Sequence, residues 1–179
     1  TFHMIQNTIM YENEKATDNA HKDKAKTTIE YLKKFKVQSL ETAEKFSRIV
    51  VQSNGGRMKP LSTLNREIVQ KVSGKASLFD LNSNQVILGM LTRPDIWGDL
   101  KFIKIKTPKL KKYLNIDENE KYLAFSQVFV DNKYILGEEA EKAMQTKPIE
   151  RGTYEKDIIN VDERLNIVYS TFNAGLFNI

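Results

Sequence analysis

The most informative stretch of the chain is Val50-Val51-Gln52-Ser53-Asn54-Gly55-Gly56-Arg57-Met58-Lys59-Pro60-Leu61-Ser62-Thr63. Its β-branched start predicts a strand. The two glycines predict a tight turn, because glycine adopts positive φ without steric cost. Pro60 fixes φ and lacks an N–H, so the residues after it are extended or begin a helix, for which Thr63 is the predicted N-cap. The stretch therefore predicts a strand, a turn with a basic rim and a helix start in immediate succession.

Apolar spacing predicts helices on both sides of this stretch. Ile29, Leu32 and Phe35 have helical spacing, and Ser39 is expected to cap the next helix. After the turn, a helix carrying apolar residues at every fourth position is expected to end at Gly74. The longest seam consists of Tyr154, Ile158, Val161, Leu165, Val168 and Phe172.

Further helices and strands follow from capping and turn residues. Asn82 and Gln85 have the spacing of a capping box, whose helix buries Val86, Ile87, Met90 and Leu91 and stops at Pro94. Residues 100–106 are expected to form a half-exposed strand, and Thr107-Pro108 the start of a helix. Residues 122–130 fit a strand or a helix, and residues 136–144 a helix. The predicted fold class is α+β, mainly helical: a single compact domain with a short sheet and a long C-terminal helix.

Composition limits the chemistry available. The chain of 179 residues is 40% hydrophobic and carries a net charge of +5. It has no cysteine, and its two histidines, His3 and His21, both lie near the N-terminus. Disulfides, thiolate catalysis and zinc or haem sites built on paired internal histidines are therefore excluded for this chain. No stretch is long and apolar enough to span a membrane. Residues 1–28 are polar and are expected to form a flexible or loosely packed arm, and both ends are consistent with a piece of a longer protein.

Several candidate sites have a plain structural alternative. Gly55-Gly56-Arg57 lacks the spacing of a phosphate-binding loop. Arg57 and Lys59 are suited to carboxylates of a partner. For Arg57, an ion pair with acidic residues of its own domain is an equal alternative. Adjacent acids such as Asp162-Glu163 do not face each other on a helix and are interpreted as surface charge. We reject Ser73-Gly74-Lys75 as a nucleophile and base, because it lies at a helix end without a supporting motif.

The densest basic stretch comprises the lysines at 101, 104, 106, 109, 111 and 112. Lysines on an edge strand protect it against pairing with another chain. The alternative is a surface for anionic lipid headgroups or for acidic groups of a ligand. The nearby Trp97 is expected in the core, although an interface anchor or a ligand platform remains open.

Two segments around the opening stretch resemble a known family. Residues 43–52 (AEKFSRIVVQ) and 55–63 (GGRMKPLST) look like the extracytoplasmic region of System II cytochrome c biogenesis proteins of the Bacteroidetes type, in which ResB-like and CcsA-like parts are often joined. The likeness continues at 69–73, 84–90, Pro94 with Trp97, and 162–167, and covers about residues 35–179. Thr42 and Ser47 depart from the family pattern, which has histidine and glycine there. The family's tryptophan-rich haem-handling segment and membrane histidines are absent from this chain.

The resemblance implies that residues 29–179 form a soluble extracytoplasmic domain on the periplasmic side of the inner membrane. Such a domain would act as a scaffold or docking module in haem delivery to apocytochrome c, with apocytochrome c and the membrane-embedded parts of the same complex as partners. Haem would be handled by the full-length protein, with no cofactor bound by this domain, no nucleic acid and no catalysis by the fragment alone. The predicted partner-binding residues are Gln52, Asn54, Gly55, Gly56, Arg57, Lys59, Pro60 and Thr63.

Two other function classes remain open from the residues. One is a stand-alone basic binding module for an acidic partner such as nucleic acid, which would show a steep salt dependence of binding. The other is an enzyme acting on a small anionic substrate, for which carboxylates and lysines are almost the only acid–base groups available.

Overall fold

The computed structural model describes residues 23–52, 56, 58–131 and 133–175. The chain divides into two compact units, Thr1–Gln38 and Ser39–Ile179. In the first unit, residues 23–38 form a helix, as the spacing of Ile29, Leu32 and Phe35 predicts. Most of the predicted arm at residues 1–28 lies outside the described residues, so its boundary stays a prediction.

The second unit alternates helices with very short strands. Its elements in chain order are α2 (Leu40–Ser47), β1 (Val50–Gln52), β2 (Met58–Pro60), α3 (Leu61–Ser73), β3 (Ser77–Leu78), β4 (Leu81–Asn82), α4 (Ser83–Thr92), α5 (Pro94–Trp97), β5 (Lys101–Lys104), α6 (Pro108–Tyr113), β6 (Tyr122–Ala124), the 3-10 helix η1 (Phe125–Val128), β7 (Phe129–Val130), β8 (Lys133–Tyr134), α7 (Gly137–Gln145) and α8 (Thr153–Phe172).

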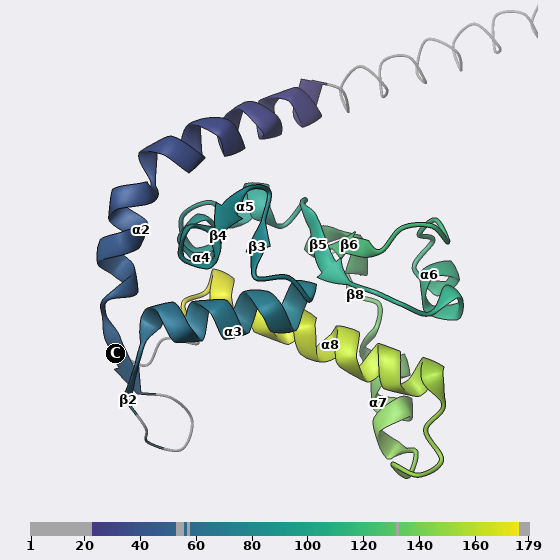
Figure 1. Ribbon diagram of the computed structural model, residues 1–179. Helices are drawn as coiled ribbons and strands as arrows, with labels where there is room; N and C mark the ends of the chain where they lie inside the picture. The colour runs from purple at the N-terminus through teal and green to yellow at the C-terminus, as the bar shows by residue number, and fades with distance from the viewer. Residues whose placement is uncertain (1–22, 53–55, 57, 132, 176–179) are drawn as a thin grey trace, which may run out of the picture. The chain divides into compact units, whose positions relative to one another are not determined.

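Helices α3 and α8 lie side by side and form the centre of this unit (Figure 1). Helix α4 and strand β5 pack on both of them, and α7 packs along α8. The strands form four separate antiparallel pairs, β1–β2, β3–β4, β5–β6 and β7–β8. The predicted class, α+β and mainly helical with a long C-terminal helix, is confirmed. The expected short sheet is four two-stranded pairs.

The core follows the predicted apolar seams. Trp97 is fully buried, which confirms its predicted place in the core. Its indole packs against Gly89, where an added Cβ would lie 2.5 Å from Trp97 Nε1, so only glycine fits there. The largest fully buried side chains are Trp97, Phe102, Leu61, Leu81, Ile87, Met90, Ile103, Leu110, Leu123, Leu136, Ile158 and Val72.

Several predicted helix ends are confirmed, but Ser39 precedes α2 without the expected side-chain capping bond, and the cap predicted at Thr63 is wrong. The Asn82 side chain accepts a hydrogen bond from Gln85 N, and the Gln85 side chain accepts one from Asn82 N, which is the predicted capping box. Gly74 ends α3 with φ +76°. Thr63, however, is not an N-cap: α3 begins at Leu61, directly after Pro60. The helix starts earlier because Leu61 is buried and its N–H donates to Ile49 O at 2.7 Å, which joins β2 to the helix without a turn.

Polar residues of α8 are also buried, contrary to the interpretation of Asp162 as surface charge. Asp162 is 9% exposed and accepts a hydrogen bond from the Tyr134 hydroxyl at 2.5 Å. Burial and the Asp162 carboxylate raise the pKa of Tyr134. Asp157 Oδ2 accepts bonds from Lys106 N, Thr107 N and Thr107 Oγ1 at 3.0, 2.7 and 2.6 Å. Helix α8 therefore holds distant segments by side-chain hydrogen bonds as well as by its apolar seam.

Candidate functional site

The β1–β2 hairpin contains the stretch that the sequence singles out. Its strands pair Val50 with Pro60, Val51 with Lys59, and Gln52 with Met58. Opposed residues of an antiparallel pair lie on the same face, so the hairpin has two different faces. Val51 is 2% exposed and faces the core, whereas Val50 and Met58 are 51% and 65% exposed. Gln52 and Pro60 are exposed on that same outer face.

One hydrogen bond fixes which backbone groups the hairpin leaves open. The bond from Leu61 N to Ile49 O joins the residues that flank the Val50–Pro60 pair. In an antiparallel ladder this makes Val50–Pro60 a non-hydrogen-bonded pair, and alternation makes Val51–Lys59 the hydrogen-bonded one. The N–H and C=O groups of Val50 and Gln52 therefore point away from β2.

This outer edge of β1 is unoccupied by the described residues. None of their backbone or side-chain groups hydrogen-bonds to the outward N–H or C=O of Val50 or Gln52. The outer edge of β2 differs, because Pro60 has no N–H to offer and the chain turns at once into α3. The hairpin thus presents one complete strand edge, beside a small apolar face formed by Val50 and Met58.

The predicted site residues divide into three groups. Gln52 and Pro60 lie on the exposed face of the hairpin, as described. Lys59 lies on the opposite face, where its Nζ forms an ion pair with Glu67 Oε2 at 2.5 Å, so its charge is engaged within the domain. Thr63 is exposed in the first turn of α3.

The remaining predicted residues lie in the connection between the strands. Gly56 has φ +81°, a conformation that favours glycine. Asn54, Gly55 and Arg57 lie outside the described residues, so neither the predicted turn nor the two roles weighed for Arg57 are tested. Sequence reasoning missed Val50 and Met58, because apolar residues of a strand are ordinarily assigned to the core; the period-2 alternation around Val51 is the signal that separates them.

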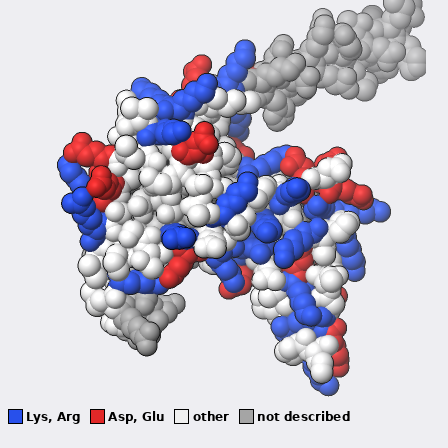
Figure 2. Space-filling model, viewed as in Figure 1, with Lys and Arg blue, Asp and Glu red and all other residues white. Residues whose placement is uncertain are grey.

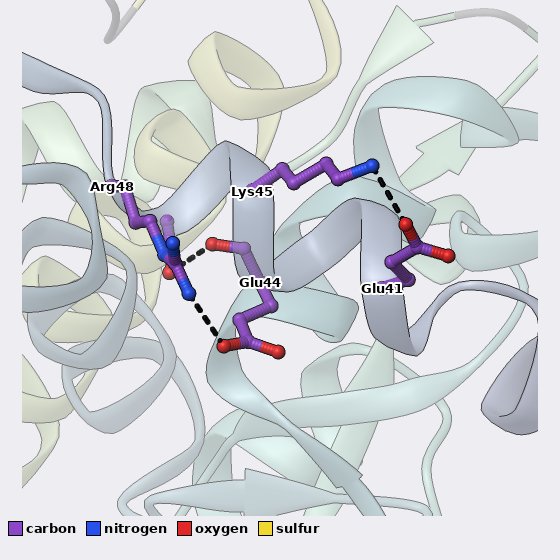
Figure 3. Close-up of polar contacts among 5 residues, drawn as sticks. Glu41, Glu44, Lys45 and Arg48 are labelled. Atoms are coloured by element: carbon purple, nitrogen blue, oxygen red, sulfur yellow. Dashed lines mark hydrogen bonds and ion pairs between the residues drawn. The ribbon is translucent and has the colours of Figure 1, made fainter.

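Charged residues beside the hairpin are neutralised locally. On α2, Lys45 Nζ lies 2.7 Å from Glu41 Oε1, and Arg48 Nη2 lies 2.8 Å from Glu44 Oε1 (Figure 3). Both pairs are exposed and have i,i+4 spacing, so each contributes only about 0.3–0.5 kcal/mol. The described part of the hairpin surface consequently offers backbone hydrogen bonding and apolar contact.

Other candidate chemistry receives structural explanations. The Ser73 hydroxyl donates to Val69 O at 2.7 Å and accepts from Lys75 N at 3.1 Å, which fixes the end of α3. Among the described residues, no group of three or more His, Cys, Asp or Glu side chains is placed to hold a metal ion. Within the same part of the chain, none of the helices combines the length and apolar character needed to cross a membrane.

Comparison with known proteins gives one informative relative. The chain is 41% identical to Protein NrfI of Wolinella succinogenes over 150 residues. The match covers 83% of this chain but only 16% of NrfI, so the chain corresponds to a small part of that protein. A matched stretch of this length necessarily includes the hairpin, wherever it begins. No protein-family model matches the chain.

Proposed function

We propose that this chain is an extracytoplasmic docking domain of a cytochrome c maturation machine and that the β1–β2 hairpin binds a partner polypeptide. The similarity to NrfI supports a role in cytochrome c maturation. The resemblance of residues 43–63 to System II biogenesis proteins supports the finer assignment. The observation that carries the docking role is the open edge of β1 beside the exposed Val50 and Met58.

This edge suits an extended polypeptide. An added strand would hydrogen-bond to the N–H and C=O groups of Val50 and Gln52, which is the general mode of β-strand addition. Side chains of that strand would cover Val50 and Met58 and remove apolar surface from water. Apocytochrome c, whose chain is still extended before haem is attached, is the partner we favour; a membrane-embedded part of the same complex is the other.

In this proposal the covalent attachment of haem takes place outside this domain. The domain would hold the apocytochrome on the periplasmic side of the inner membrane, while haem is carried and attached by the rest of the machine. Positioning a reactant raises the rate of a reaction without any catalytic residue in the domain that positions it. A scaffold of this kind requires a rigid hairpin, which Val51 and the Leu61–Ile49 bond provide.

The proposal is tested with the full-length protein in its own cells. The double variant Val50→Glu/Met58→Glu places two charges on the docking face and is expected to lower covalently bound haem in c-type cytochromes by at least about fivefold, because a contact face would lose more than about 1 kcal/mol. The matched control is Met144→Glu/Ile149→Glu, which changes two other residues that are 48% and 94% exposed. Protein abundance is measured alongside.

Three results would count against the proposal. Equal haem attachment in the hairpin variant and the control, at equal abundance, removes the docking role. If the variant Arg57→Ala/Lys59→Ala attaches haem at the wild-type level, Arg57 and Lys59 do not belong to the docking site. Normal c-type cytochromes in cells lacking the whole gene contradict the cytochrome c assignment itself.

A further inference from the structure

Positive charge is dense in residues 101–121 of this protein. Residues 101–121 contain seven lysines and three acidic residues, whereas the net charge of the whole chain is +5. Figure 2 shows Lys and Arg side chains gathered over β5, β6 and α6, while the surface around the β1–β2 hairpin is mostly uncharged in that view. This basic face is a separate feature from the hairpin.

Some of these lysines have partners inside the domain. Lys111 is buried and donates to Glu118 O at 2.7 Å, and Lys101 pairs with Glu120 at 2.5 Å. In the described part of the chain, Lys104, Lys106 and Lys112 have no carboxylate partner. Their like charges repel one another, and an acidic partner would relieve that repulsion.

Protection of a strand edge does not account for these lysines. The bond from Ile105 N to Lys121 O makes Lys104–Tyr122 a non-hydrogen-bonded pair, so the outward C=O of Lys104 faces away from β6. That carbonyl already accepts a bond from Arg164 Nη1 at 2.7 Å. Beyond the strand, Asp157 accepts the N–H groups of Lys106 and Thr107. Side chains of α8 thus bond the Lys104 carbonyl and the two N–H groups beyond the strand, which leaves the lysine side chains available for another role.

Two hollows lie along this segment. The first, of about 380 Å³, lies where the β3–β4 and β5–β6 pairs meet and is lined by Lys75, Lys101, Phe79 and Tyr122 together with Ser77, Leu78, Asp80 and Phe102. The second, of about 430 Å³, lies between the start of α6 and α8 and is lined by Lys106, Lys156, Thr107, Pro108, Thr153, Asp157 and Asn160. Each hollow therefore has two lysines at its wall, of which Lys101 is already paired with Glu120.

The acidic residue in the wall of the second hollow is already engaged by the protein. The Asp157 carboxylate is 5% exposed, and its Oδ2 accepts three hydrogen bonds from the protein itself. In the first hollow Asp80 is the acidic residue, and Lys75 lies with its Nζ 5.1 Å from the Tyr122 ring centroid. A cation held over an aromatic ring keeps its charge available to a second, anionic contact.

We infer that this face binds an acidic polypeptide segment, with carboxylates entering the two hollows. The charge of the unpaired lysines is complementary to carboxylates, and concave hollows fit discrete side chains better than a flat membrane surface. Lys101 and Lys106 are separated by five residues of mostly extended chain, which spans roughly 16 Å. A peptide of similar extended length reaches both hollows. The inference stands independently of the cytochrome c assignment.

The test measures binding of the whole chain to a fluorescein-labelled peptide of alternating glutamate and alanine, with the glutamine–alanine peptide as a reference. Lys75→Glu/Lys106→Glu, with one change in each hollow, is expected to weaken binding about tenfold, because each reversal replaces an attraction by a repulsion. The control Lys34→Glu/Lys147→Glu lowers the net charge equally but lies outside both hollows, and it is expected to bind as the unchanged chain does.

Two results overturn the inference. Equal weakening by both double variants shows that only net charge matters. Binding to phosphatidylglycerol vesicles or to a DNA duplex that depends on Lys75 and Lys106, without binding of the glutamate peptide, assigns the face to a membrane or to nucleic acid. Unaltered circular dichroism of both variants establishes that the comparison is made between folded proteins.

Discussion

The outer edges of β1 and β5 are treated in opposite ways. Both strands belong to two-stranded antiparallel pairs and both leave backbone groups pointing outward. On β5, Arg164 covers the carbonyl of Lys104, and just beyond it Asp157 covers two N–H groups. On β1, the outward groups of Val50 and Gln52 have no partner among the described residues. The comparison teaches that this fold is able to close a strand edge, which makes the open edge of β1 informative.

The largest loss of unfolding free energy is expected for Asp157, which bonds the backbone just beyond β5. Asp157→Ala leaves the N–H groups of Lys106 and Thr107 and the Thr107 hydroxyl without their acceptor, which costs about 3 kcal/mol of unfolding free energy. Urea unfolding followed by circular dichroism measures this loss. Glu163→Ala is the control, because Glu163 lies on the same helix with an exposed side chain that pairs with Lys71. A loss as large as that of Asp157→Ala would contradict the account.

A smaller loss is expected from the other side chain that closes β5. Arg164 donates to Lys71 O and Lys104 O, and burial lowers the pKa of its guanidinium. Arg164→Met keeps much of the apolar stem but removes both donors, so we expect a loss of about 1–2 kcal/mol in the same urea experiment. Unchanged stability would show that the Lys104 carbonyl does not need this bond.

Two single substitutions to proline distinguish the N–H groups of β1 that bond to β2 from those that point outward. Val51→Pro removes a donor that bonds to Lys59, whereas Gln52→Pro removes one that points outward. Val51→Pro is therefore expected to be less stable than Gln52→Pro by at least about 1 kcal/mol, because it loses one hydrogen bond and also the buried side chain of Val51. Thermal unfolding of both variants tests this order, and the reverse order would show that the deduced register is wrong.

The smallest change in unfolding free energy is expected from the exposed ion pair between Glu44 and Arg48. Glu44→Gln removes the carboxylate partner of Arg48, but both side chains are well exposed. Water and salt screen such pairs, so unfolding free energy should change by less than about 0.5 kcal/mol. A loss above about 1 kcal/mol in urea unfolding would mean that α2 supports the hairpin electrostatically.

Sequence patterns predict the elements that depend on near neighbours. The capping box of Asn82 and Gln85, the end of α3 at Gly74 and the apolar seam of α8 all arise within a few residues of chain, and all are confirmed. The burial of Asp157 was not predicted, because its donors lie about fifty residues away in sequence. The start of α3 was misplaced at Thr63 because the Leu61–Ile49 bond is tertiary information.

The same limit applies to the candidate site. The sequence indicates a strand and a glycine turn around Gln52 and Gly56, but it does not show which hairpin face is outward or which backbone groups are paired. That distinction requires the register of Val51 against Lys59 and the burial of Val51. The apolar side chains of the outer face, Val50 and Met58, become visible as a docking surface only after the register is known.

The most direct test of the open β1 edge is amide hydrogen exchange measured by NMR on the folded protein. The account predicts that the N–H groups of Val50 and Gln52 exchange at nearly unprotected rates, whereas those of Val51, Lys106 and Thr107 are protected by their hydrogen bonds. Adding a partner polypeptide that docks on the edge should slow Val50 and Gln52 selectively. Protection of Val50 and Gln52 as strong as that of Thr107 in the free protein would contradict the central claim, because the edge of β1 would then already be occupied.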